Sequence, residues 1–186
     1  MRSSTTRYAQ LSKYRTLWAA LSDWQGTLPL YLDWTKHNSA LSTHVYLKLQ
    51  RPFIETQFEC IRMKLNWSIA HLDPLLMVKF QSLWDVGDAK AECLQAGQRV
   101  LAIIDEIGTP SDSYRLYHWE AVRATTTLVQ MALRHDMVEG ERRMDLVDSC
   151  RRGIEISRKL IPAVLARIES TLENTLEEYV RCLKGN

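Results

Sequence analysis

Apolar residues recur at steps of three and four along most of this chain, and this spacing restricts its fold more than any other feature. Such steps place side chains on one face of an α-helix, whereas a strand needs apolar and polar residues to alternate. The 186 residues show no sustained alternation and include only 7 Gly and 5 Pro, which favours long helices over many turns. The sequence therefore predicts an all-α fold of six or seven packed amphipathic helices.

The first half of the chain predicts two helices. The first ends near Gly26, where Leu28-Pro29-Leu30 begins a turn, and residues 35–43 are polar and predict a loop. We expect the second helix to begin at Pro52, whose ring suits a first helical turn, and to end at Asp73-Pro74. The residues expected to face inward are Tyr8, Leu11, Tyr14, Leu17, Trp18, Leu21 and Trp24 in the first helix, and Phe53, Ile54, Phe58, Ile61, Leu65, Ile69 and Leu72 in the second.

The second half predicts four more helices within one domain. Asp88 is expected to cap a helix over 89–107, which Gly108-Thr109-Pro110 ends. Its inward positions should be Cys93, Ala96, Val100, Ile103, Ile104 and Ile107. Ser111 or Ser113 should cap a helix that contains Tyr114 and Tyr117 and runs to Leu133. After a loop around Gly140, helices are expected over 141–160 and 163–183, joined or kinked at Pro162. We interpret 1–186 as a single domain, with an N-terminal helix and turn (5–34), a core (52–160) and a C-terminal helix (161–186).

Charge is nearly balanced over the whole chain. The formal net charge of +2 predicts neither DNA nor membrane binding. Residues 1–64 are mildly basic, with 9 Lys+Arg against 4 Asp+Glu, and we interpret this excess as a solvated face in preference to a phosphate-binding patch. The apolar stretch 61–80 has at most 8 uncharged residues in a row (65–72), against the roughly 18 that a membrane-spanning helix needs.

The four cysteines indicate thiols and not a metal site. Cys60, Cys93, Cys150 and Cys182 are 33, 57 and 32 residues apart, without the close C-x-x-C pairs of a zinc site. The chain opens with a polar segment that lacks the apolar run of a secretory signal. We therefore expect reduced thiols in a cytoplasmic or nuclear protein.

No familiar catalytic signature is present, and we predict no catalytic, cofactor-binding or metal-binding residue. The acidic pair Asp105-Glu106 is interpreted as a solvated helix end, and His71 and Asp73 as residues that cap or pack near a helix end. His118 is interpreted as a packing residue. The tryptophans Trp18, Trp24, Trp67 and Trp119 are expected to anchor the core. The alternative is that Trp67, His71 and Trp119 line an apolar effector pocket, since such pockets are rich in aromatic residues.

Two segments of the N-terminal half fit motifs that combine an aromatic residue with a proline. Residues 17–30 resemble the pattern L-x-x-W-x-x-x-L-P-x-x-L. Residues 63–76 are similar to L-x-x-Y-h-x-a-x-x-L-h-R-P-x-L, with Trp67 near the aromatic position, Asp73 in place of the arginine and Pro74 retained. Arg51-Pro52 is a second candidate for the R-P pair.

Two further segments follow in the same order. Residues 92–97 resemble a helix with C-x-x-A-A, where Gly97 replaces the second alanine, and Trp119–Leu133 is similar to W-x-x-x-x-a-x-x-l-l. This ordered set covers roughly residues 11–160. It resembles the regulatory, or middle homology, region of fungal binuclear zinc-cluster transcription factors.

The resemblance implies an all-helical regulatory domain of a nuclear transcription regulator, which acts through protein partners and a small-molecule effector. The family's six-cysteine zinc cluster and basic arm are not in this sequence, so we expect no direct contact with nucleic acid by that route, and we expect a fragment, an excised domain or a degenerate relative. The faces of 141–183 are the candidate protein contact. There Glu155, Glu169, Glu173, Glu177 and Glu178 interleave with Arg151, Arg152, Arg158, Lys159 and Arg167.

Two other hypotheses remain beside this one. The chain could be an α-helical enzyme or small-molecule carrier built around Trp67, His71 and Trp119, or a helical assembly subunit without a ligand. A homodimer fits either the regulatory or the assembly hypothesis.

Overall fold

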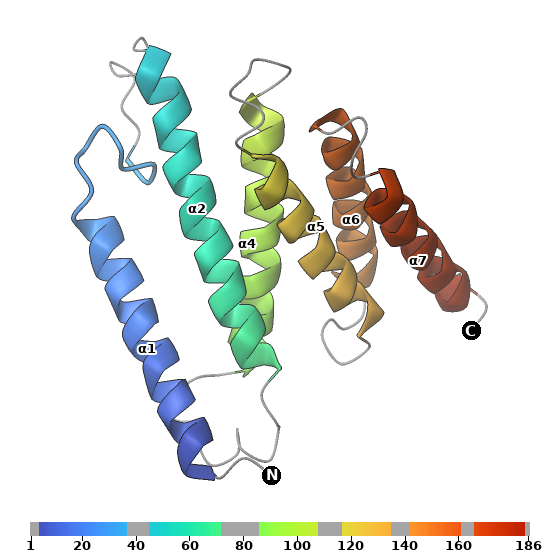
Figure 1. Ribbon diagram of the computed structural model, residues 1–186, viewed down its shortest axis with the longest axis horizontal. Helices are drawn as coiled ribbons and strands as arrows, with labels where there is room; N and C mark the ends of the chain where they lie inside the picture. Colours follow the sequence, from blue (N-terminus) through green and yellow to red (C-terminus); the bar gives the residue numbers. More distant parts are fainter. Residues whose placement is uncertain are drawn as a thin grey trace.

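The computed structural model describes residues 4–36, 45–71, 86–107, 117–134, 142–160 and 166–184. These residues form six helices and no strand, which confirms the all-α prediction. The helices are α1 (Ser4–Gly26), α2 (Val45–Ala70), α4 (Val86–Ile107), α5 (His118–Leu133), α6 (Arg142–Leu160) and α7 (Ala166–Lys184). They stand side by side in chain order, and each runs opposite to the one before it (Figure 1).

The helix α4 lies at the centre of the core, because it contacts α2, α5 and α6. Its predicted inward face is confirmed: Cys93, Ala96, Val100 and Ile104 have no exposed surface. Burying a side chain of the size of Ile104 stabilises the fold by about 1.5–3 kcal/mol. The core continues through Leu128 of α5 to α6 and α7.

Two glycines allow helices to approach closely. A Cβ on Gly97 of α4 would lie 3.0 Å from the Leu128 side chain of α5. A Cβ on Gly153 of α6 would collide with the Oγ1 of Thr125 and lie 3.0 Å from the Leu101 side chain. Close packing of α4, α5 and α6 therefore depends on glycine at the points where these helices touch.

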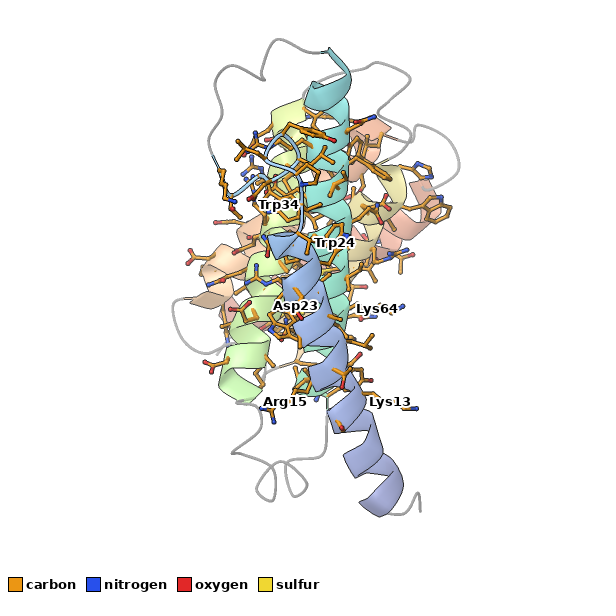
Figure 2. The ribbon with its side chains drawn as sticks, turned by 90° about the vertical axis from the view of Figure 1, so that its left-hand side faces the viewer. Lys13, Arg15, Asp23, Trp24, Trp34 and Lys64 are labelled. Atoms are coloured by element: carbon orange, nitrogen blue, oxygen red, sulfur yellow. The ribbon has the colours of Figure 1, made fainter. Side chains whose placement is uncertain are left out.

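The helix α1 joins the rest of the molecule through an aromatic cluster at its C-terminal end. Trp24 lies 6.4 Å from Trp34, and both rings lie against Phe58 of α2, at 6.3 and 5.2 Å between centroids. The predicted turn after Gly26 is present, with backbone amides of Leu32 and Asp33 donating to the Pro29 carbonyl. The helix crosses in front of α2 and α4, with Trp24 and Trp34 at its upper end (Figure 2).

The turn is closed by the buried side chain of Asp33. Its carboxylate accepts hydrogen bonds from the Thr35 hydroxyl at 2.6 Å and the Thr35 amide at 3.0 Å, and it pairs with Lys36 at 2.9 Å. The hydrogen bond from the Thr35 side chain, followed by the one from Lys36, lowers the pKa of Asp33 to about 2. This carboxylate fixes the peptide that carries Trp34 into the aromatic cluster.

The predicted start of the second helix was wrong. The helix α2 begins at Val45, and Pro52 lies inside it. Residues 45–51 contain no helix breaker, so their helical preference outweighs the one backbone hydrogen bond that the proline removes. The helix ends at Ala70, and Asp73-Pro74 lies outside the described residues.

The predicted N-cap at Asp88 was also wrong. The helix α4 begins at Val86, so Asp88 lies in its first turn, where a carboxylate still favours the positive end of the helix dipole. The helix α5 begins at His118 with Tyr117 at the N-cap position and no side-chain capping bond. The caps expected at Ser111 or Ser113, with Tyr114, Gly140 and Pro162, lie outside the described residues.

Four residues expected inside are substantially exposed. Leu17 is 53% exposed, Trp24 42%, Ile61 47% and Trp119 58%, whereas Trp18 and Trp67 are half-buried. Ile61 is left outside because the face that α2 turns towards its neighbours includes the polar residues Glu55, Glu59 and Asn66, all buried. The buried face is therefore rotated away from the purely apolar one.

Candidate interaction surface

The predicted pocket residues Trp67 and His71 do lie together at the end of α2, Trp67 in its last turn and His71 directly after it. Their ring centroids are 3.8 Å apart, and Nδ1 of His71 lies 2.7 Å from the Trp67 carbonyl oxygen. The His71 side chain is exposed, while Trp67 packs partly against the core. The pair forms the end of a helix, as expected of His71.

Trp119 lies elsewhere on the molecule. It is in the first turn of α5, next to the His118 ring at 5.0 Å. Its neighbour Glu120 accepts a hydrogen bond from Gln57 at 2.9 Å, which places the start of α5 beside the middle of α2. Trp67 is ten residues further along α2, about 15 Å at a helical rise of 1.5 Å per residue. The three residues therefore do not meet at one point.

A ladder of partly buried charges joins α2 to α4. Arg99 of α4 pairs with Glu55 at 2.7 Å and with Glu106 at 3.2 Å. One step along, Arg62 of α2 pairs with Glu59 at 3.1 Å and also with Glu92 of α4. Four carboxylates thus share two guanidinium groups, and the two on α2 are buried. Such pairs specify one arrangement of α2 against α4 more than they stabilise it.

Burial raises the pKa of the two buried glutamates, Glu55 and Glu59, whereas their arginine partners lower it. Desolvation raises the pKa of Glu55, although its hydrogen bond and charge interaction with Arg99 act in the opposite sense. Desolvation likewise raises the pKa of Glu59, against the attraction of Arg62. Both carboxylates are therefore easier to protonate in the fold than in water.

The cysteines are free thiols of two kinds. Cys60, Cys93 and Cys150 are buried, and burial raises the pKa of each to about 12. Cys182 on α7 is exposed. A thiolate is the reactive form of cysteine, so the three buried thiols are inert in the folded chain.

Charged side chains of α6 and α7 form ion pairs with each other. Arg158 of α6 pairs with Glu173 of α7, and Arg151 pairs with Glu177 at 3.4 Å. Arg152 reaches back to Asp105 of α4, so this acidic pair near the α4 terminus is solvated and paired. Five of the charges first considered as a protein contact therefore pair with another helix of this chain: Arg151, Arg152, Arg158, Glu173 and Glu177.

The surface where α1 meets α2 has the opposite character. We call it the α1–α2 strip and define it by Lys13, Leu17 and Trp24 of α1 with Ile61 and Lys64 of α2. All five are exposed, with Leu17 at 53%. Lys13 and Lys64 extend on the same side of α1 (Figure 2). Among the side chains that the structure describes, neither lysine has a carboxylate partner.

The α1 part of the strip can be recognised in the sequence, beside the residues of α1 that face inward. Lys13, Leu17 and Trp24 are spaced four and seven residues apart, so they share one stripe of the helix. The inward part of α1 is carried instead by Tyr14, Trp18 and Leu21, which are half-buried. The apolar arc of α1 is thus wider than the contact that covers it, and the excess forms the strip.

Within the described ranges, no group of three His, Cys, Asp or Glu side chains could hold a metal ion, and none of the helices there is both long and apolar enough to cross a membrane. No protein-family model, curated protein or solved structure matches this chain.

Proposed function

We propose that this chain is a non-enzymatic regulatory domain of a fungal-type transcription factor, which acts in the nucleus by binding another protein through the α1–α2 strip. The observation that carries the proposal is the contrast between the two ends of the molecule. Cations on α6 pair with acids of α4 and α7, while Lys13 and Lys64 have no carboxylate partner among the described side chains and lie beside exposed apolar ones.

The ordered motifs provide the second support. The segment with Trp24 and Pro29, the helix with Trp67, the Cys93 helix and the Trp119 helix occur on α1 and its turn, α2, α4 and α5. The resemblance to the middle homology region implies a helical domain, and an all-α arrangement is compatible with it. From this resemblance we propose that the present chain also binds a protein partner.

The proposed mechanism is a change in how α1 packs. Its described contact with the rest of the chain is mainly with α2, through Trp24, Trp34 and Phe58. A partner that touches both α1 and α2 binds best when the two are held together, so it shifts the population towards the docked state. An activation surface that depends on α1 then responds to the partner.

A reporter assay tests this proposal. Fusing residues 1–186 to a heterologous DNA-binding domain should change expression from the matching reporter in a fungal cell. The change should disappear with Lys13→Glu/Lys64→Glu and persist with Arg15→Glu. A fusion whose reporter output equals that of the DNA-binding domain alone, at equal protein level, contradicts the proposal.

A further inference from the structure

We infer that the partner of the α1–α2 strip is an acidic amphipathic helix, with apolar residues on one face and Asp or Glu beside them. This inference rests on the proposed function and specifies the chemistry of its partner. Both the apolar and the charged half of the strip contribute to it.

The apolar half has the form of a helix-binding surface. Leu17 and Trp24 follow one stripe of α1, two turns apart, since seven residues span about 10 Å at 1.5 Å per residue. Ile61 stands one turn beyond Phe58 on α2, and Phe58 stacks on Trp24, so Ile61 lies alongside that stripe. Helices recognise such a surface with anchors spaced three, four and seven residues apart.

The charged half fixes the sign of the partner. Lys13 and Lys64 flank the apolar side chains, and both are exposed. Asp23, the acid nearest to Trp24 in the sequence, lies about 100° around α1 from that tryptophan, since each residue advances the helix by that angle. A surface whose lysines have no carboxylate partner among the described side chains attracts acids and rejects bases, and this sets partner choice and association rate.

Two other binding partners fit the strip less well. A helix that lies on a membrane inserts its whole apolar face, whereas Tyr14, Trp18 and Leu21 at the centre of that face are half-buried within the protein. Nucleic acid needs a dense basic surface, whereas the strip has two cations in a chain of net charge +2.

A peptide selection tests the inference. A library of random peptides of about 20 residues, long enough for five helical turns, is selected for binding to the full chain. The enriched peptides should be acidic, with Leu, Phe or Trp at helical spacing. One enriched peptide is then synthesised with a fluorophore, and its Kd is measured by anisotropy against the variants.

Each half of the strip has a matched control. Lys13→Glu/Lys64→Glu should weaken binding at least tenfold, whereas Arg15→Glu, on the other side of α1 in Figure 2, should change it less than twofold. Leu17→Ser should weaken binding about fivefold or more, and Met144→Ser, an exposed apolar residue of α6, should not. Raising the salt concentration should reduce the effect of the lysine variant and preserve that of Leu17→Ser. Circular dichroism confirms that every variant is folded.

Three results would overturn the inference: a selection without an acidic amphipathic consensus, an Arg15→Glu effect equal to that of the lysine pair, or lysine-dependent binding to phosphatidylserine vesicles without peptide binding. The reporter assay separates this failure from that of the proposed function. A fusion that still changes expression while no acidic peptide binds preserves the regulatory function and rejects only the partner class.

Discussion

Trp24 of α1 stacks on Phe58 of α2, with ring centroids 6.3 Å apart, and this contact holds the first helix against the core. The Phe58 side chain is buried and also touches Trp34, so one residue supports both tryptophans. The α1–α2 strip is made of residues from both helices, so it exists only while α1 packs against α2.

Phe58→Ala should therefore release α1 before the rest of the chain. Removing a buried phenylalanine side chain lowers the free energy of unfolding by about 3–5 kcal/mol. Hydrogen exchange should accelerate most over residues 12–26, because local opening follows the weakest packing. Phe58→Leu keeps most of the volume and should have a smaller effect. Equal acceleration in all six helices would show that α1 is not held at this point.

Gly153→Ala should destabilise the crossing of α5 and α6. The new methyl group would collide with Thr125, a side chain with no exposed surface, and overpacking of this kind lowers the free energy of unfolding by about 1–3 kcal/mol. Gly26→Ala is the control, because no atom lies within 4 Å of its Cβ position. Combining Gly153→Ala with Thr125→Ala should recover part of the loss in urea unfolding, and strict additivity of the two changes would refute the collision.

The stability of the fold should depend on pH through the two buried glutamates, Glu55 and Glu59. The pKa of Glu55 and that of Glu59 are raised in the fold, so the fold binds protons more readily than the unfolded chain. Their contribution to stability is greatest below the ordinary glutamate pKa and is lost as the pH rises through the raised values. Glu55→Gln/Glu59→Gln should flatten this part of the melting-temperature profile between about pH 7 and pH 5. A profile unchanged by the double substitution would mean that both carboxylates titrate normally.

Thiol labelling should separate the cysteines into two classes. Cys182 is exposed and should react with iodoacetamide at once. Cys60, Cys93 and Cys150 are buried, and burial raises the pKa of each to about 12, so they stay protonated. Mass spectrometry should therefore find one fast label on the folded chain and three more only in denaturant. Rapid labelling of a buried cysteine would show that the core opens there.

The all-α class was predictable because apolar residues recur at helical steps along most of the chain, and on α4 this spacing also gives the buried face. Cys93, Ala96, Val100 and Ile104 repeat at helical steps, and they are the buried face of α4. Helix starts were less predictable, since Pro52 and Asp88 are compatible with a first turn in isolation, and preceding residues decide whether the helix begins earlier.

The charge ladder and the strip depend on distant partners, which local patterns do not contain. Glu55 reads as a solvent-facing residue until Arg99, forty-four positions later, is placed beside it. Ile61 reads as a core residue because it continues the apolar repeat, and only the rotation of α2 towards α4 leaves it outside. Pairing was equally hidden: Arg158 of α6 pairs with Glu173 of the next helix, whereas Lys64 of α2 has no carboxylate partner within the part of the chain that the structure describes.

The central claim is that partners bind where α1 meets α2, and hydrogen exchange with and without a selected acidic peptide tests it most directly. The claim predicts slower exchange in 12–26 and 57–71, with residues 143–160 and 170–182 unchanged. Protection that falls on α6 and α7, and leaves α1 and α2 unchanged, would contradict it.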